Sequence, residues 1–205
     1  MSRPQRVTNE AIYEAAHEII MQHGPASLTF QTLGKATGLV PAALVRRFKS
    51  KQQLFIEVDT YCLEKAANTL AEAAKRFDSA LDAIVYGLSG EMGFAMSANV
   101  YVNGLAFLLK GLDTPELYKN YQAAFRRQED DIRQLLEKAV TQMELRQNVD
   151  CVGLAKLLQI TQQGACHMWI MSQEEPIEKC IERHLRTLLE AYKNPSRGLV
   201  SHDAK

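Results

Sequence analysis

Apolar side chains recur at intervals of three and four residues along most of the chain, in stretches that begin at good helix caps and end near glycine or proline. This spacing places apolar groups on one face of an α-helix, and no stretch shows the alternation of a half-buried strand. With 205 residues, of which 46% are hydrophobic, the chain can bury a core without disulfide or metal support. The predicted fold class is all-α.

Start and stop signals divide the chain into helices. Thr8, Ser50, Ser79 and Asp150 are good N-caps, and a proline follows the cap residue Thr114. The predicted helices cover residues 9–23, 30 to near 38, 41 to about 48, 51 to about 77, 80–95, 115 to about 146, a stretch beginning at 151, and 176–194. The helix boundary within residues 92–109 stays open. Residues 195–205 are predicted to be a disordered tail.

The net charge of zero conceals an asymmetry. Residues 1–51 carry seven basic and three acidic side chains, a net charge of +4, so the remaining residues carry −4. A local positive patch suits the phosphate backbone of a nucleic acid.

Residues 29–48 are the most specific part of the chain. Two short helices are separated by Ala36-Thr37-Gly38-Leu39, with glycine where a positive φ is easiest. The second of these helices opens with small residues, and Arg46, Arg47, Lys49 and Lys51 fall within six positions. The pattern predicts a helix-turn-helix, in which the second helix enters the major groove. The alternative is an ordinary helical hairpin inside a bundle.

The segment of about residues 8–55 resembles the DNA-binding domain of the TetR/AcrR family of bacterial transcriptional regulators. The matching positions are Thr8 to Gly24, the run from Thr29 to Gly38, Pro41-Ala42-Ala43-Leu44, Phe48, Ser50-Lys51 and Leu54. Three positions depart from the family pattern. Val40 stands where the family has a Ser or Thr cap, Val45 where it often has Tyr, and Arg47 where it often has His.

The resemblance implies a helix-turn-helix domain at residues 1–51 and a larger helical domain at 52–194 that binds a small effector and dimerises. It implies a transcriptional regulator, a repressor that binds a palindromic double-stranded DNA operator as a homodimer and is released by a small, largely apolar effector. The alternative is a helical adaptor or ligand-binding protein without sequence-specific DNA binding.

The predicted DNA-binding residues follow from the register of the third helix. Leu44 and Phe48 are one turn apart and face the core, which leaves the other residues of that helix toward DNA. Arg46 could bind guanine, and Ala42 or Val45 could pack on thymine methyl groups, whereas plain phosphate contact is the alternative for Arg46 and Arg47. The predicted set is Thr29, Pro41, Ala42, Ala43, Val45, Arg46, Arg47 and Lys51, with Thr29 and Lys51 at family positions that meet phosphates.

The effector prediction rests on the uncharged stretch 92–109, where methionine and aromatic side chains alternate with asparagines. Such a mixture suits an apolar cavity with a few orienting polar groups, although a plain helical core is the alternative. The predicted effector residues are Tyr86, Met92, Met96, Asn99, Asn103 and Phe107.

The last two helices form the usual dimer interface of the family. The resemblance therefore implies an interface at the apolar residues Leu158, Ala165, Trp169, Ile181, Leu185 and Leu188. The alternative is that these stripes pack within one chain.

The four cysteines form no CxxC pair and the five histidines no ligand-spaced cluster. We therefore expect reduced thiols, a cytoplasmic protein, no metal and no cofactor. The N-terminus shows no signal-peptide pattern, and the uncharged stretches are interrupted by polar residues, which predicts no contact with a membrane. No nucleophile–base pair or phosphate loop is present, so an enzyme is not expected.

Overall fold

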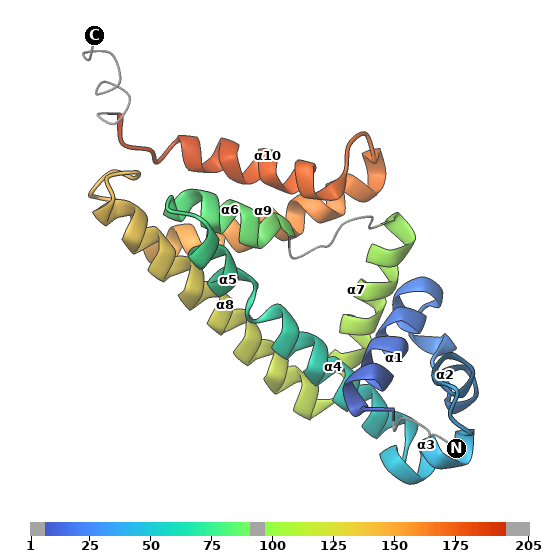
Figure 1. Ribbon diagram of the computed structural model, residues 1–205. Helices are drawn as coiled ribbons and strands as arrows, with labels where there is room; N and C mark the ends of the chain where they lie inside the picture. The colour runs from blue at the N-terminus through green and yellow to red at the C-terminus, as the bar shows by residue number, and fades with distance from the viewer. Residues whose placement is uncertain (1–6, 91–96, 196–205) are drawn as a thin grey trace. The chain divides into compact units, whose positions relative to one another are not determined.

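The computed structural model describes residues 7–90 and 97–195. Throughout these residues the regular structure is helical, apart from one isolated bridge between Leu145 and Lys193, so the all-α prediction is confirmed. The chain forms two compact units (Figure 1). The first unit comprises Met1–Lys65 and Ser97–Ala123, and the second comprises Ala66–Met96 and Ala124–Lys205.

The first unit contains the N-terminal helices and one later helix that packs against them. Its elements are α1 (Asn9–His23), the 3₁₀ turn η1 (Pro25–Ser27), α2 (Phe30–Thr37), α3 (Pro41–Phe48), α4 (Lys51–Ala66), α7 (Ala98–Leu112) and the first turns of α8 (Pro115–Thr141). The predicted caps Thr8 and Ser50 accept hydrogen bonds from the backbone of Ala11 and Gln53. Helix α1 packs against both α2 and α7 (Figure 1).

The core of the first unit is built from the stripes that the sequence pattern indicates. Ring centroids of Phe55 on α4 and Phe107 on α7 lie 4.5 Å apart in an edge-to-face contact. Burial of the apolar side chains of this core contributes the main favourable free energy that holds α3 and α4 against α1. The fully buried side chains around them are Ile12, Ala16, Ile20, Leu28, Leu33, Leu44, Leu54, Val58 and Leu117.

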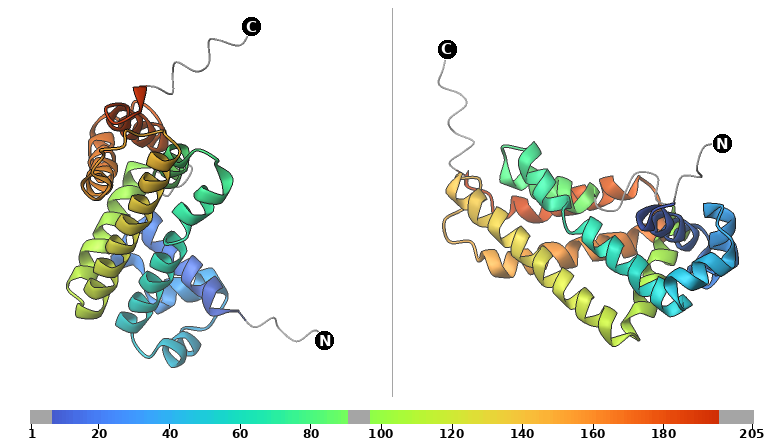
Figure 2. Two further views of the ribbon diagram at one scale, coloured as in Figure 1. Left: turned by 90° about the vertical axis from the view of Figure 1, so that its left-hand side faces the viewer. Right: turned by 60° about the horizontal axis from the view of Figure 1, so that its bottom comes forward.

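The second unit contains α5 (Thr69–Arg76), α6 (Ala80–Gly90), the rest of α8, α9 (Cys151–Ser172) and α10 (Ile177–Glu190). The short connection of residues 173–176 folds α10 back beside α9, and α6 packs against α10 (Figure 2). The side chain of Asp150 accepts from the backbone of Gly153, which confirms it as the N-cap of α9.

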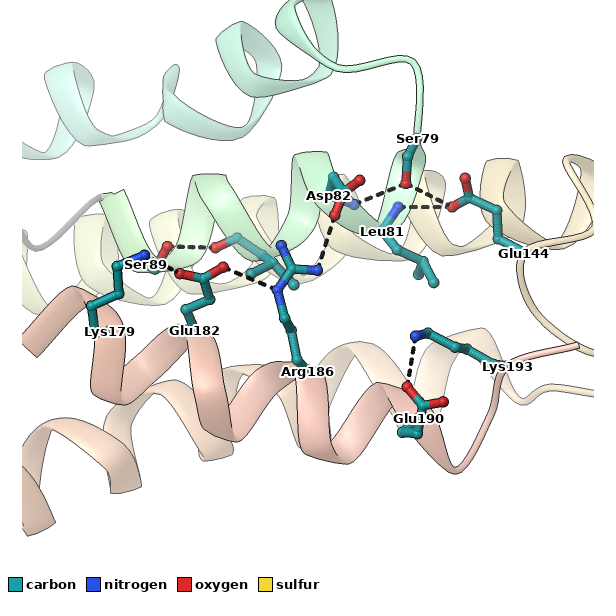
Figure 3. A network of polar contacts seen from close by, with 11 residues as sticks. Ser79, Leu81, Asp82, Ser89, Glu144, Lys179, Glu182, Arg186, Glu190 and Lys193 are labelled. Atoms are coloured by element: carbon teal, nitrogen blue, oxygen red, sulfur yellow. Dashed lines mark hydrogen bonds and ion pairs between the residues drawn. The ribbon is translucent and has the colours of Figure 1, made fainter. Parts of the chain in front are cut away.

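Polar contacts fasten α6 to its neighbours (Figure 3). The buried carboxylate of Glu144 accepts hydrogen bonds from the backbone N–H of Leu81 at 3.0 Å and the hydroxyl of Ser79 at 3.2 Å. It thereby satisfies an otherwise unpaired donor at the start of α6. Arg186 of α10 bridges to Asp82 of α6 at 3.0 Å.

Several helix boundaries differ from the prediction. The last helix, predicted over residues 176–194, covers Ile177–Glu190, and the end of the helix predicted over residues 80–95 lies outside the described residues. The helix predicted for residues 51–77 is two helices, because the chain turns at Ala67 and Asn68 before α5 begins. The hydroxyl of Thr69 donates to the carbonyl of Ala66 at 2.9 Å, a local bond that competes with helix continuation. Helix α8 ends at Thr141 rather than near residue 146, since the chain must turn to bring Glu144 to α6.

The compact units also differ from the predicted domains. The predicted boundary between residues 51 and 52 would separate α3 from α4, yet α4 shares the first core through Leu54, Phe55 and Val58. Most of the predicted tail, residues 195–205, lies outside the described residues, which end at Pro195.

No helix among the described residues is long and apolar enough to span a membrane. The four cysteines are free, and in the described part of the chain no cluster of His, Cys, Asp or Glu could hold a metal ion.

Candidate DNA interface

The turn between α2 and α3 depends on two glycines. Gly38 adopts φ 72° and ψ 11°, the left-handed conformation that glycine reaches without steric cost. On α2, a Cβ added to Gly34 would lie 2.6 Å from the carbonyl oxygen of Leu39, and the ring of Pro41 lies just beyond. The two helices therefore approach as closely as they do because residue 34 has no side chain.

A capping box holds the start of α2. The hydroxyl of Thr29 accepts from the backbone N–H of Thr32 at 3.0 Å, and the hydroxyl of Thr32 accepts from the N–H of Thr29 at 2.9 Å. This reciprocal pair satisfies two donors at the helix end. Thr29, predicted to meet a phosphate, is thus also the structural cap of the first helix of the motif.

Helix α3 buries one side and exposes the other. Leu44 and Phe48 are fully buried in the first core, as the register predicts. The side chains of Pro41, Ala42, Val45, Arg46 and Arg47 are exposed, and Ala43 is half-buried. Six of the eight predicted DNA-binding residues therefore belong to this single helix.

The N-terminal end of α3 is unusually apolar. Val40 occupies the N-cap with φ −70° and ψ 140°, and it makes no side-chain capping bond. Its side chain is 67% exposed, and that of Val45, farther along the helix, is 44% exposed. The sequence resemblance identified Val40 only as a missing cap, because the exposure of a side chain is set by the folded motif.

The cations at the C-terminal end of α3 differ in their surroundings. The guanidinium of Arg47 donates to the carbonyl oxygen of Val7 at 3.0 Å, which ties the start of α1 to α3. Lys49 has φ 65°, and its Nζ donates to the carbonyl oxygen of Arg46 at 3.0 Å. Among the described residues, no ion pair neutralises Arg46, whose side chain lies on the exposed side opposite Leu44 and Phe48.

Lys51 lies at the start of α4, with its Nζ 3.5 Å from the carbonyl oxygen of Ala26. Partial burial lowers the pKa of Lys51, and repulsion from Lys110 on α7 adds to that effect. Because Lys51 is the first residue of α4, its amine lies near the N-terminus of that helix, a position that attracts anions.

The predicted effector residues fall in both units. The side-chain amide of Asn103 donates to the carbonyl oxygen of Met21 at 2.8 Å, and Phe107 is buried against Phe55, so both help pack α7 onto α1 and α4. Asn99 is exposed near the start of α7. Met92 and Met96 lie outside the described residues.

Tyr86, the remaining predicted effector residue, belongs to the second unit. Its hydroxyl accepts from the guanidinium of Arg76 at 2.6 Å, and its ring lies 5.1 Å from that of Phe77. Together with residues of α5 it lines a shallow cavity of about 460 Å³. The described effector residues thus have local packing partners, and the effector site stays a prediction.

The predicted dimer residues lie inside the second unit. Leu158, Ala165, Trp169, Ile181 and Leu185 are buried within the single chain, and Leu188 is half-buried. Helix α10 packs on both α9 and α6, an arrangement that helps to bury these stripes.

A different apolar stripe runs along the exposed side of α9. Its members follow helical spacing and comprise Leu157, Ile160, Gly164, Met168 and Met171. A Cβ added at Gly164 would meet no atom within 4 Å, so this position is open. The spacing of three and four was visible in the sequence, but a helix that is apolar on two sides does not reveal which side faces its own chain.

Comparisons with known proteins agree with this geometry. Residues 12–58 match the model of the family described as bacterial regulatory proteins, tetR family. No curated protein matches the chain.

Solved structures of regulators share the fold. The regulator FadR from Bacillus subtilis, in complex with stearoyl-CoA, is 16% identical with a TM-score of 0.70, covering 88% of this chain and 97% of its own. SmeT, the repressor of the Stenotrophomonas maltophilia multidrug efflux pump SmeDEF, is 20% identical with a TM-score of 0.68, covering 93% and 92%. A TetR-family regulator from Agrobacterium tumefaciens is 18% identical with a TM-score of 0.72, covering 90% and 97%.

A capped helix-turn-helix with an exposed basic reading helix, joined to further helices, defines a DNA-binding transcriptional regulator. Residues 12–58 are similar to the DNA-binding segment of the tetR family of bacterial regulatory proteins, in agreement with the resemblance seen in the sequence.

Proposed function

We propose that this protein is a repressor that binds a palindromic operator as a homodimer and is released by a small, largely apolar effector. The observation that carries the proposal is the exposed side of α3. It presents Ala42, Val45 and Arg46, which has no ion pair within residues 7–90 and 97–195, while Leu44 and Phe48 anchor the helix in the core. A rigid helix with this division can be inserted into a major groove without disturbing its own domain.

The apolar stripe of α9 supports a dimer. Ile160 and Met168 are each 67% exposed, and Gly164 between them leaves room for close approach of a second helix. A two-fold axis would pair this stripe with its own copy, as isologous interfaces do. Interface residues proposed from this geometry are therefore those of the stripe, in place of the buried set predicted from the sequence.

Release by an effector follows from linkage. A ligand that prefers a spacing of the two α3 helices different from the DNA-bound spacing lowers DNA affinity by its differential affinity for the two states. Only Lys49 and Ser50 lie between the end of α3 and the start of α4, so a displacement of α4 is passed to α3. The stearoyl-CoA bound to FadR and the repressor role of SmeT belong to those proteins, and they support a ligand-responsive repressor here.

Selection of bound sequences from a random duplex pool tests the proposal. We expect recovery of a palindromic site, with affinity that falls steeply as salt concentration rises. Transcription from a promoter overlapping that site should decrease when the protein is added. Recovery of no preferred sequence would identify a non-specific or purely protein-binding module, and increased transcription would identify an activator.

A further inference from the structure

The N-terminal half of the reading helix offers DNA almost no hydrogen-bonding side chain. Val40, Pro41, Ala42, Ala43 and Val45 carry only hydrocarbon side chains. In a helix-turn-helix the N-terminal residues of the second helix contact base edges. Whatever these residues read must therefore be recognised by apolar contact and shape.

The major groove displays one apolar group that can serve this purpose, the C5-methyl group of thymine. Cytosine, guanine and adenine present donors and acceptors at their edges, and burying those groups against valine without partners is unfavourable. A hydrocarbon surface at the groove floor therefore discriminates for a pyrimidine with a C5-methyl group.

Val40 is the residue on which this discrimination depends most. It is 67% exposed, against 44% for Val45, and it makes no capping bond that would turn its side chain back to the helix. Its β-branched side chain is also stiff, so little rotamer freedom is lost on contact.

We infer that Val40, supported by Val45, is a specificity-determining residue that reads a C5-methyl pyrimidine in each operator half-site. The inference rests on the proposed DNA-binding function and deepens it. The base is thymine in unmodified DNA, and 5-methylcytosine offers the same methyl group.

Replacement of single thymines by deoxyuridine in the selected duplex tests the inference, because this change removes only the methyl group. We expect at least one thymine per half-site at which deoxyuridine weakens wild-type binding about fourfold, the factor that corresponds to about 0.8 kcal/mol for one methyl-sized group. In V40A the deoxyuridine penalty at one of these positions should disappear. Because Val40 makes no capping bond, this truncation removes no cap from α3.

Two further variants serve as controls. V40S introduces a better cap while deleting both methyl groups, so it should keep the fold and still lose the penalty. V152A truncates a similarly exposed valine on α9, and it should retain the full wild-type pattern.

A second comparison uses 5-methylcytosine, and the outcomes distinguish failure of the inference from failure of the proposed function. At the sensitive position, 5-methylcytosine paired with guanine should bind about fourfold more tightly than cytosine paired with guanine. The inference is overturned if no deoxyuridine substitution lowers affinity, or if the penalty is unchanged in both V40A and V40S. Failure to select any preferred duplex would instead overturn the proposed function itself.

Discussion

The hydroxyl of Tyr121 on α8 donates a 2.8 Å hydrogen bond to the carboxylate of Asp59 on α4, inside the core of the first unit. Asp59 is only 3% exposed, and its second oxygen, Oδ2, has no hydrogen-bond partner. Gly111 of α7 packs directly against the same tyrosine ring. Three helices thus meet at one incompletely satisfied carboxyl group.

This burial makes stability depend on pH. Loss of solvation raises the pKa of Asp59 from its ordinary 3.8 to about 6, although the tyrosine hydrogen bond opposes the shift. The folded protein therefore holds the proton more tightly than the unfolded chain. The stabilisation from this proton is complete below pH 3.8 and is lost as pH rises through 6.

Asp59→Asn should remove this dependence. Relative to wild type, the free energy of unfolding of the variant should rise by about 2.4 kcal/mol between pH 4 and pH 7, since one pKa unit is worth about 1.36 kcal/mol and the carboxyl of the unfolded chain is already partly ionised at pH 4. Urea unfolding at several pH values measures it. Parallel pH profiles for the two proteins would contradict the assignment.

Tyr121→Phe provides the opposite change. It removes the only donor to the Asp59 carboxylate among the described residues, so the pKa of Asp59 should rise further. We expect a loss of about 1.5–3 kcal/mol in stability at pH 7, the range for a hydrogen bond to a charged group. The loss should shrink at pH 4, where the carboxyl is protonated; an equal loss at both pH values would indicate a packing effect alone.

Gly34→Ala should destabilise the helix-turn-helix. The added Cβ would collide with the carbonyl of Leu39, so backbone must move, at a typical cost of about 1–3 kcal/mol. Thermal unfolding and DNA affinity should both decline. Gly104→Ala on α7 is the control, because its Cβ would lie 3.4 Å from the flexible Met21 side chain. Equal behaviour of the two variants would refute the close approach of α2 to the turn.

Charge on the α9 stripe should separate the dimer. Ile160→Glu should give a folded monomer with weak operator binding, because Ile160 is exposed in the single chain and contributes little to its core. Leu185→Ala should instead lower stability by about 2–5 kcal/mol, since Leu185 is fully buried. Sedimentation velocity at micromolar protein concentration measures the oligomeric state of the wild type and of each variant. A monomeric wild-type protein, or a dimeric Ile160→Glu variant, would show that the apolar stripe of α9 is not the dimer interface.

Arg46 and Arg47 form a matched pair for specificity. Arg46→Ala should relax discrimination at one base pair per half-site by about 1–3 kcal/mol, because Arg46 extends freely from the DNA side. Arg47→Ala should weaken all duplexes alike, since its guanidinium is committed to Val7. Titrations on the selected site and its single-base variants measure both. Uniform weakening by Arg46→Ala would assign it to phosphate.

Local signals predicted the first unit well. Caps at Thr8 and Thr29, the glycine at 38 and the register of Leu44 and Phe48 each act within a few residues, so sequence alone places them. The break after Ala66 was not predicted, because Asn68 and Thr69 are tolerated inside helices. Only the tertiary packing around them decides whether the helix is interrupted there.

The interfaces were harder to predict for a related reason. Helix α9 is apolar on two sides, and hydrophobic periodicity cannot tell which side meets α10. Burial assigned Leu158 and Trp169 to the chain's own core and left Ile160 and Met168 outside. Likewise, the partners of Asn103 and Phe107 lie on α1 and α4, distant in sequence.

The central claim is that two α3 helices of one dimer read two operator half-sites together. The most direct test is the affinity for the selected site with five base pairs inserted between the half-sites, which turns one of them to the opposite side of the duplex. The two reading helices must lie about one DNA turn apart, roughly 34–36 Å, so we predict a loss of at least about tenfold. Unchanged affinity for the expanded site would contradict the account.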